Sequence, residues 1–270
     1  MRKNRILIIL IICALCSGCG LPQPANKPGA ISETGFDLLS DSPEEMQDFP
    51  EQNDISEDRI MSYAEFLAAD MDQPVTIESY LQEKLAWSDG SADLFLQDEE
   101  GAYYVYHLAC TLDEYEALNI GQKLRISGYK TLFSGELQLT DACFRTVNGF
   151  FIAEPADVTE IFESDELYRY LNRRVLFRGL TIEPMFDGTS PFYYGWDNSG
   201  SMDNGSDLYF TASCSGMESS FVVKEQLRGT DSETYRTVQS LRVGDTVDLQ
   251  GILFWYNGSQ PLVTSISVIS

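Results

Sequence analysis

Residues 118–139, LNIGQKLRISGYKTLFSGELQL, align without a gap on residues 241–262, LRVGDTVDLQGILFWYNGSQPL. The copies share three glycines at matching places: Gly121 with Gly244, Gly128 with Gly251, and Gly135 with Gly258. Between the first two glycines, apolar residues alternate with polar ones, with Leu124 and Ile126 matching Val247 and Leu249. This is the period of a strand with one buried face. Each copy therefore predicts a turn, a strand with a glycine inside it, a hairpin turn and a second strand.

The glycines inside the strands, Gly128 and Gly251, predict a bulge or the sharp bend of a small barrel. Ahead of each copy the pattern predicts a short amphipathic helix, three strands and a second helix. In the first half these elements are expected at 63–69, 75–81, 93–98, 102–110 and 112–118, and in the second half at 165–171, 174–182, 208–212, 220–224 and 231–240.

This order of three strands, a helix and a glycine-led hairpin resembles the oligonucleotide/oligosaccharide-binding (OB) fold, a five-stranded Greek-key barrel. We therefore predict an all-β-dominated chain with two tandem five-stranded OB-like Greek-key barrels and short helices. The barrels are expected at 61–150 and 156–270. Because the linker at 148–156 is short, an apolar patch is expected to dock them.

The N-terminus carries the pattern of an export signal. Basic residues among the first five are followed by an apolar core, Ile6 to Leu15, and then by Cys16-Ser-Gly-Cys19. The core is too short to span a bilayer as a permanent helix. The segment resembles the lipobox of bacterial lipoproteins, although Cys16 stands where leucine is usual. That resemblance implies a signal peptide at 1–19, a palmitate-type lipid on Cys19, and a place on the outer face of the cell membrane.

Residues 20–60 are rich in Pro, Ser, Asn, Asp and Glu, a composition that cannot bury enough apolar surface to fold. We predict a disordered acidic linker that tethers the barrels to the membrane. With its lipobox and its two glycine-hairpin units, the whole chain resembles the OB-fold lipoproteins of Gram-positive bacteria.

The charge limits the partners. Lys and Arg number 18 against 42 Asp and Glu, which gives a formal net charge of −24. Such a surface repels phosphate backbones and anionic headgroups. The charge thus argues against nucleic acid, although the OB-like pattern keeps single-stranded nucleic-acid binding open as the alternative function.

Aromatic residues on the second and third strands are where an OB fold stacks its ligands. Phe95, Tyr104 and Tyr106 in the first half and Tyr209 in the second half are the candidate ligand-binding residues. Alternation along a strand places Tyr104 and Tyr106 on one face and Tyr103 on the other, so at least one ring is expected outside the core. Packing in the core or between domains is the alternative role for each of them.

No cofactor is expected. His107 is the only histidine and no Cys-x-x-Cys occurs, so the usual zinc, haem and iron–sulfur ligand sets cannot form. Asp197, Asp203 and Asp207 form part of a calcium-loop pattern, but the closing glutamate is missing and a hairpin loop explains them better. After export, Cys110, Cys143 and Cys214 allow at most one disulfide, and the sequence leaves open whether Cys110 joins Cys143.

Catalytic motifs are also missing. The match to Ser-x-x-Lys at Ser127 and Lys130 lies on strands and lacks its companion motifs. We therefore predict a membrane-anchored, non-catalytic module that binds an envelope protein or a glycan, with avidity from its two barrels. A cation-dependent enzyme using carboxylates is the third and least favoured function.

Overall fold

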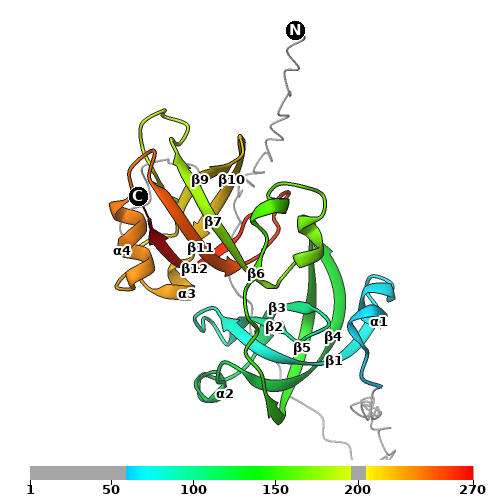
Figure 1. Cartoon of the computed structure of the whole chain (residues 1–270). Helices are drawn as coiled ribbons and strands as arrows, with labels where there is room; N and C mark the ends of the chain where they lie inside the picture. Colours follow the sequence, from blue (N-terminus) through cyan, green and yellow to red (C-terminus); the bar gives the residue numbers. More distant parts are fainter. Residues whose placement is uncertain (1–58, 196–204, 270) are drawn as a thin grey trace, which may run out of the picture. The chain divides into compact units, whose positions relative to one another are not determined.

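The computed structural model describes residues 59–195 and 205–269. The first repeat copy lies in a closed five-stranded barrel, barrel 1, with strand order β1-β2-β3-β5-β4 (Figure 1). The β3–β5 pairing is parallel and the other pairings are antiparallel, as in a Greek-key OB barrel. Its elements are α1 (Tyr63–Ala68), β1 (Pro74–Lys84), β2 (Ser91–Gln97), β3 (Ala102–Ala109), α2 (Leu112–Ala117), β4 (Gln122–Phe133) and β5 (Glu136–Phe150).

Helix α1 packs into the core of barrel 1. Ser62 and Glu65 form a capping box at its start, and its Phe66 is buried with the ring centroid 5.0 Å from that of Tyr103. At its C-terminal end, the buried Lys130 Nζ of β4 donates to the carbonyl oxygens of Leu67 (2.8 Å) and Ala69 (2.6 Å). These contacts satisfy carbonyls that the helix itself leaves free. Lys130 therefore has a structural role, in keeping with a chance match to Ser-x-x-Lys.

The second repeat copy lies in barrel 2. Strands β7, β11, β12, β10 and β9 follow one another in the sheet, and an additional β7–β9 pairing closes the ring. This is the strand order of barrel 1, and within the ring of five strands one pairing, β10–β12, is again parallel. The short strand β6 adds a parallel pairing with β7 outside the ring. Its elements are β6 (Ala156–Asp157), η1 (Thr159–Ile161), η2 (Leu167–Tyr170), β7 (Arg174–Glu183), β8 (Tyr193–Tyr194), β9 (Leu208–Cys214), β10 (Met217–Val223), α3 (Glu225–Arg228), α4 (Glu233–Ser240), β11 (Thr246–Ile252) and β12 (Leu262–Val268).

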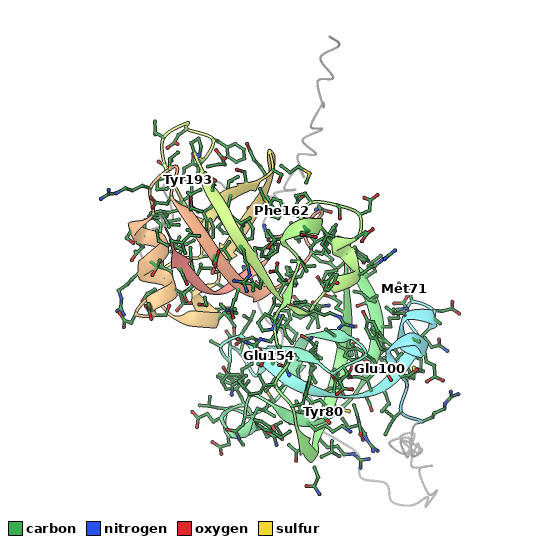
Figure 2. All side chains as sticks on the ribbon, viewed as in Figure 1. Met71, Tyr80, Glu100, Glu154, Phe162 and Tyr193 are labelled. Carbon is green, nitrogen blue, oxygen red and sulfur yellow. The ribbon has the colours of Figure 1, made fainter. Side chains whose placement is uncertain are left out.

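The core of barrel 2 is built around aromatic rings. Phe162, labelled in Figure 2, lies 5.8 Å from Phe177 and 6.3 Å from Phe221 between ring centroids. The helix expected at 165–171 is the short 3₁₀ helix η2, whose Leu167 is buried in the same core. The prediction of two tandem OB-like barrels is thus confirmed, with β6 and β8 as additions to the second.

The paired mid-strand glycines mark close contacts between strands. A Cβ on Gly128 would lie 2.8 Å from the Thr140 carbonyl oxygen, and one on Gly251 would lie 2.3 Å from that of Leu262. The strand register shifts at both places. The predicted bulges are confirmed, and the reason for glycine is that no other side chain fits against the neighbouring backbone.

The repeat loses its register after these glycines. Leu139 lies in the core of barrel 1, whereas the residue aligned with it, Leu262, lies outside the core of barrel 2. Val263 occupies the core there instead. Strand β11 ends at Ile252 and β12 begins at Leu262, while β4 and β5 continue almost to the tip of their hairpin. The fifth strand of barrel 2 is therefore shifted by one residue, which turns Leu262 outward.

A separate apolar cluster joins the two barrels. Phe95 and Tyr104 from barrel 1 pack with Val222, Ile252 and Leu262 from barrel 2. The docking by an apolar patch that the short linker suggested is present in this cluster.

Hydrogen bonds also connect the start of β5 in barrel 1 to residues of the second half of the chain. Glu136, at the start of β5, accepts hydrogen bonds from Asn172 Nδ2 at 2.7 Å and from the Trp255 backbone N–H at 2.9 Å. The Tyr168 hydroxyl donates to the Gly135 carbonyl oxygen at 2.8 Å. Burial raises the pKa of Glu136 to about 8, although both hydrogen bonds oppose the rise. The contact between the barrels therefore contains a buried acid whose pKa lies well above its ordinary value.

Candidate functional site

The four candidate ligand-binding rings lie in different surroundings. Phe95 and Tyr104 are buried and stack on each other at 4.9 Å between centroids, and Phe254 of barrel 2 packs edge-on against both. Tyr209 is partly buried against the same cluster. Barrel 2 therefore covers the face of β2 and β3 on which an OB fold stacks its ligands. Phe95 and Tyr104 lie in the contact between the domains, which was the alternative role for these rings. Only Tyr106, 41% exposed, is open to solvent.

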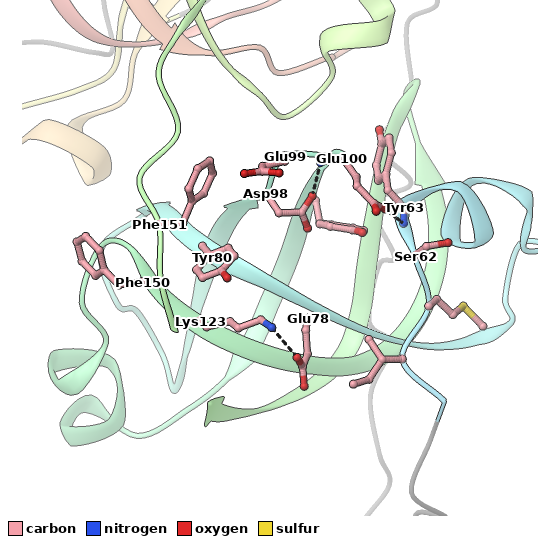
Figure 3. Close-up of a pocket in the computed structure, with 13 residues that line it drawn as sticks. Ser62, Tyr63, Glu78, Tyr80, Asp98, Glu99, Glu100, Lys123, Phe150 and Phe151 are labelled. Carbon is pink, nitrogen blue, oxygen red and sulfur yellow. Dashed lines mark hydrogen bonds and ion pairs between the residues drawn. The ribbon is translucent and has the colours of Figure 1, made fainter. Parts of the chain in front are cut away.

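An open pocket of about 630 Å³ lies elsewhere on barrel 1 (Figure 3). Its walls come from β1, the start of β4, the end of β5, the β2–β3 turn and the segment leading into α1. This volume lies in the range of small-molecule sites. The residues that line it are Ile60, Met61, Ser62, Tyr63, Glu78, Tyr80, Asp98, Glu99, Glu100, Tyr103, Lys123, Phe150 and Phe151.

Three aromatic rings form one wall of the pocket. Tyr80 and Phe151 lie 5.4 Å apart between centroids, and the neighbouring Phe150 is 72% exposed. The buried Gln82 holds Phe151 in place, since its Nε2 donates to the Phe151 carbonyl oxygen at 3.1 Å while its Oε1 accepts from the Ala153 N–H at 2.9 Å. The wall therefore presents ring surface on a backbone fixed by hydrogen bonds.

An ion pair lies at the base of this wall. Glu78 contacts Lys123 Nζ at 2.8 Å (Figure 3). It also contacts Arg125 Nη2 at 2.5 Å. Burial would raise the pKa of Glu78, but the two cations outweigh it and lower that pKa. Lys123 Nζ also lies 5.7 Å from the centre of the Tyr80 ring. Glu78 thus pairs both with Lys123, which lines the pocket, and with Arg125 beside it.

The β2–β3 turn brings three acidic residues, Asp98, Glu99 and Glu100, to the pocket. Asp98 Oδ1 accepts the backbone N–H groups of Glu100 and Gly101 at 2.9 Å each, which closes the β2–β3 turn. Glu100 accepts the Tyr63 N–H at 3.3 Å. No contact in the described part of the chain holds Glu99, which is exposed. Hydrogen-bond acceptors of the β2–β3 turn therefore line the pocket together with the aromatic rings.

Sequence reasoning missed this pocket. Tyr80 was expected in a strand, but nothing in the alternation separates it from other strand residues. Phe150 and Phe151 fall in the linker predicted at 148–156, and two adjacent aromatic residues in a short linker are the available signal.

The calcium pattern gains no support from the residues that can be examined. Asp197 and Asp203 lie outside the described residues. Asp207 instead forms an ion pair with Lys224 Nζ at 2.7 Å and accepts the Glu225 N–H at 2.9 Å. Within residues 59–195 and 205–269, no group of three or more His, Cys, Asp or Glu side chains is arranged to hold a metal ion.

Cys110, Cys143 and Cys214 are free thiols, with Cys110 buried and Cys143 exposed. Cys19 lies outside the described residues. Among the helices that are described, none is long and apolar enough to cross a membrane.

Comparison with known proteins adds a likeness of fold. No family model matches the chain, and no curated protein gives a significant match. The hypothetical protein ygiW from E. coli is 15% identical, with 34% of this chain and 92% of that chain covered and a TM-score of 0.26. An OB domain from Methanosarcina mazei is 12% identical, with coverages of 31% and 80% and a TM-score of 0.25.

A third solved structure spans more of the chain. The Ifi202 HINa domain, solved with a 20-base-pair double-stranded DNA, is 15% identical, with coverages of 72% and 92% and a TM-score of 0.29. At these scores none of the likenesses carries an inference about function, which has to be argued from the site.

Proposed function

We propose that this protein is a lipid-anchored, extracytoplasmic binding module without catalytic activity, and that it holds a partner from the cell envelope in the pocket of barrel 1. The observation that carries the proposal is the position of the pocket. Barrel 2 covers the β2–β3 face, and the rings of Tyr80, Phe150 and Phe151 provide an aromatic surface that stays open. Exposed rings in a concave site are typical of recognition surfaces.

The lipid anchor is the second part of the proposal. The pocket lies beside the residues where the described chain begins, since Ile60 and Met61 line it. A tether of about 40 residues has an end-to-end distance of roughly 35 Å, which lets the pocket search the surface near the membrane. A lipid on Cys19 supplies the attachment, and the proposed partner is an envelope protein or a glycan.

Lipidation is tested with the full chain expressed in a bacterium that is fed an alkyne fatty acid. Wild-type protein is expected to incorporate the label and to sediment with membranes. Cys19→Ala is expected to lose the label. Equal labelling of both proteins would refute the anchor.

Partner binding is tested by incubating the purified, detergent-solubilised full chain with isolated bacterial envelopes. We expect saturable binding that Phe150→Ala weakens about tenfold, because stacking on one ring contributes about 1.4 kcal/mol. Phe186→Ala is the matched control, since Phe186 is 97% exposed on the loop after β7 and outside the pocket. Equal loss in both variants, or no saturable binding by wild type, would contradict the proposal.

A further inference from the structure

We infer that the pocket of barrel 1 is a carbohydrate-binding site for neutral or amine-bearing sugars, and that it excludes anionic ones. This inference rests on the proposed binding function and selects a glycan rather than a protein as the ligand. It depends on three features of the pocket: the aromatic rings, the carboxylate hydrogen-bond acceptors that line the pocket with them, and the excess of carboxylates over cations.

The ring wall suits a sugar. The aliphatic C–H face of a pyranose packs on an aromatic ring, and such packing needs a ring that is exposed yet held in place. Phe150 is exposed at the end of β5, while Tyr80 and Phe151 support each other at 5.4 Å. These rings therefore offer a surface on which a sugar can stack, in a pocket that is open to solvent.

The acceptors suit hydroxyl groups. Glu78, Asp98 and Glu100 each line the pocket with a carboxylate. A carboxylate can accept several hydrogen bonds, and those from hydroxyl donors are strong because the acceptor is charged. Each of these three carboxylates is already oriented by contacts with the chain: Glu78 by Lys123, Asp98 by its turn and Glu100 by the Tyr63 N–H. A sugar therefore meets acceptors whose positions are largely set before it binds.

The charge balance excludes phosphate and sulfate. Glu78, Asp98, Glu99 and Glu100 line the pocket, and Lys123 is the single cation among the described lining residues. Lys123 and the neighbouring Arg125 both pair with Glu78, and among the described residues no ion pair holds Asp98, Glu99 or Glu100, so these three carboxylates would repel an anionic ligand. An ammonium group on a sugar gains from the same field, and it can also contact a ring face, as Lys123 does on Tyr80.

The test is calorimetric titration of the full chain in detergent with three probes: an N-acetylglucosamine tetramer, a glucosamine tetramer and a heparin tetrasaccharide. The first two differ in charge on the same sugar backbone. We expect both to bind, the glucosamine tetramer at least as tightly, and heparin not to bind. Phe150→Ala is expected to weaken both by about tenfold, and Phe186→Ala to change neither.

Two further variants sharpen the result. Glu99→Gln is expected to lower the affinity for the glucosamine tetramer about threefold and to leave the N-acetylated tetramer unchanged, because only the former carries charge at neutral pH. Tyr80→Ala, with folding checked by circular dichroism, is expected to weaken both tetramers. Tightest binding of heparin or of single-stranded DNA, or equal affinities of wild type and Phe150→Ala, would overturn the inference.

Failure of this inference can be told apart from failure of the proposed function. If neither tetramer binds while envelopes still bind through Phe150, the pocket has a partner other than a glycan. In that case the binding function stands and the carbohydrate assignment is wrong. If envelopes do not bind either, the proposed function itself is wrong.

Discussion

The first and fourth strands of the two barrels carry the same type of charge pair with opposite polarity. In barrel 1, Glu78 on β1 pairs with Arg125 on β4. In barrel 2, Arg178 on β7 lies 3.7 Å from Asp248 on β11, and Asp248 is the residue that the repeat aligns with Arg125. A cross-strand pair needs only complementary charges, so its direction can reverse without changing the ladder.

The residues beside this pair differ completely. Tyr80 faces Lys123 across the ladder of barrel 1, whereas Thr181 faces Thr246 at the matching place in barrel 2. The strand scaffold is therefore repeated, but the aromatic and charged residues that line the pocket of barrel 1 are not. The pocket proposed as the binding site therefore lies on barrel 1, whereas barrel 2 covers the β2–β3 face of barrel 1.

The largest change in stability is expected from Phe95→Ala, which tests whether barrel 2 covers the β2–β3 face of barrel 1. Removing this buried ring from the contact between the barrels is expected to destabilise the protein by about 4 kcal/mol, since it leaves a cavity. Urea denaturation followed by circular dichroism measures the change. Tyr106→Ala, on the same sheet face but exposed, serves as the control and should cost less than about 1 kcal/mol. Similar small losses in both variants would mean that Phe95 does not hold the barrels together.

The stability of the protein is expected to depend on pH because Glu136, the buried acid of barrel 1, has a raised pKa. The pKa of Glu136 is about 8 in the folded protein, against 4.5 as its ordinary value. Folding therefore takes up a proton between these values, so this contribution to stability is complete below about pH 4.5 and declines until about pH 8. The loss is expected to reach about 3 kcal/mol between pH 5 and pH 8.

The barrels differ at this position, because the repeat aligns Glu136 with the neutral Ser259. Glu136→Gln keeps a carbonyl acceptor but cannot titrate, so the decline with pH should be absent from its stability curve. Denaturation at a series of pH values compares the two proteins, and other groups cancel in the difference. Parallel curves would show that Glu136 ionises normally.

Smaller losses of stability are expected when the paired mid-strand glycines are replaced by alanine. Gly251→Ala is expected to destabilise the protein by about 2 kcal/mol, and Gly128→Ala by about 1 kcal/mol, since the added Cβ would lie closer to backbone oxygen at Gly251. Thermal denaturation of the two variants ranks them. The reverse order would show that the strands of barrel 1 adapt less readily than those of barrel 2.

The smallest expected effect concerns the reversed charge pair. Glu78→Gln should cost about 1 kcal/mol and Asp248→Asn about 0.3 kcal/mol, because the pair in barrel 1 is shorter and less exposed. Urea titrations at low and high salt measure both, and salt should narrow the difference. Equal losses of stability in the two variants would mean that the charge pair contributes no more in barrel 1 than in barrel 2.

Much of the fold could be predicted from the repeat. Leu124, Ile126, Val247 and Leu249 are all buried, as their alternation predicted. The one-residue shift of the fifth strand in barrel 2 could not be predicted, since Leu262 and Val263 are both apolar and both suit a strand. Only the packing of neighbouring strands selects which of them faces the core.

The candidate site was predictable only in its chemistry. The expectation that aromatic residues of barrel 1 would serve binding was reasonable, yet periodicity cannot tell a ring that faces a ligand from one that faces another domain. Phe95 and Tyr104 lie on the outer side of their strands, as alternation requires, and barrel 2 then covers them. Whether an outward face meets solvent depends on contacts between residues far apart in the chain.

By itself, the sequence determined the properties that depend on neighbouring residues: the strands, their glycine bulges, the two-barrel plan and the excess of negative charge. The tertiary structure alone decided which aromatic rings remain open, because that depends on how the barrels pack. It also gathered Tyr80, Phe150 and the carboxylates of the β2–β3 turn into one pocket and enclosed Glu136 in the contact between the barrels. Strand alternation acts over two residues, whereas these groupings join residues separated by tens of positions, and only folding brings them together.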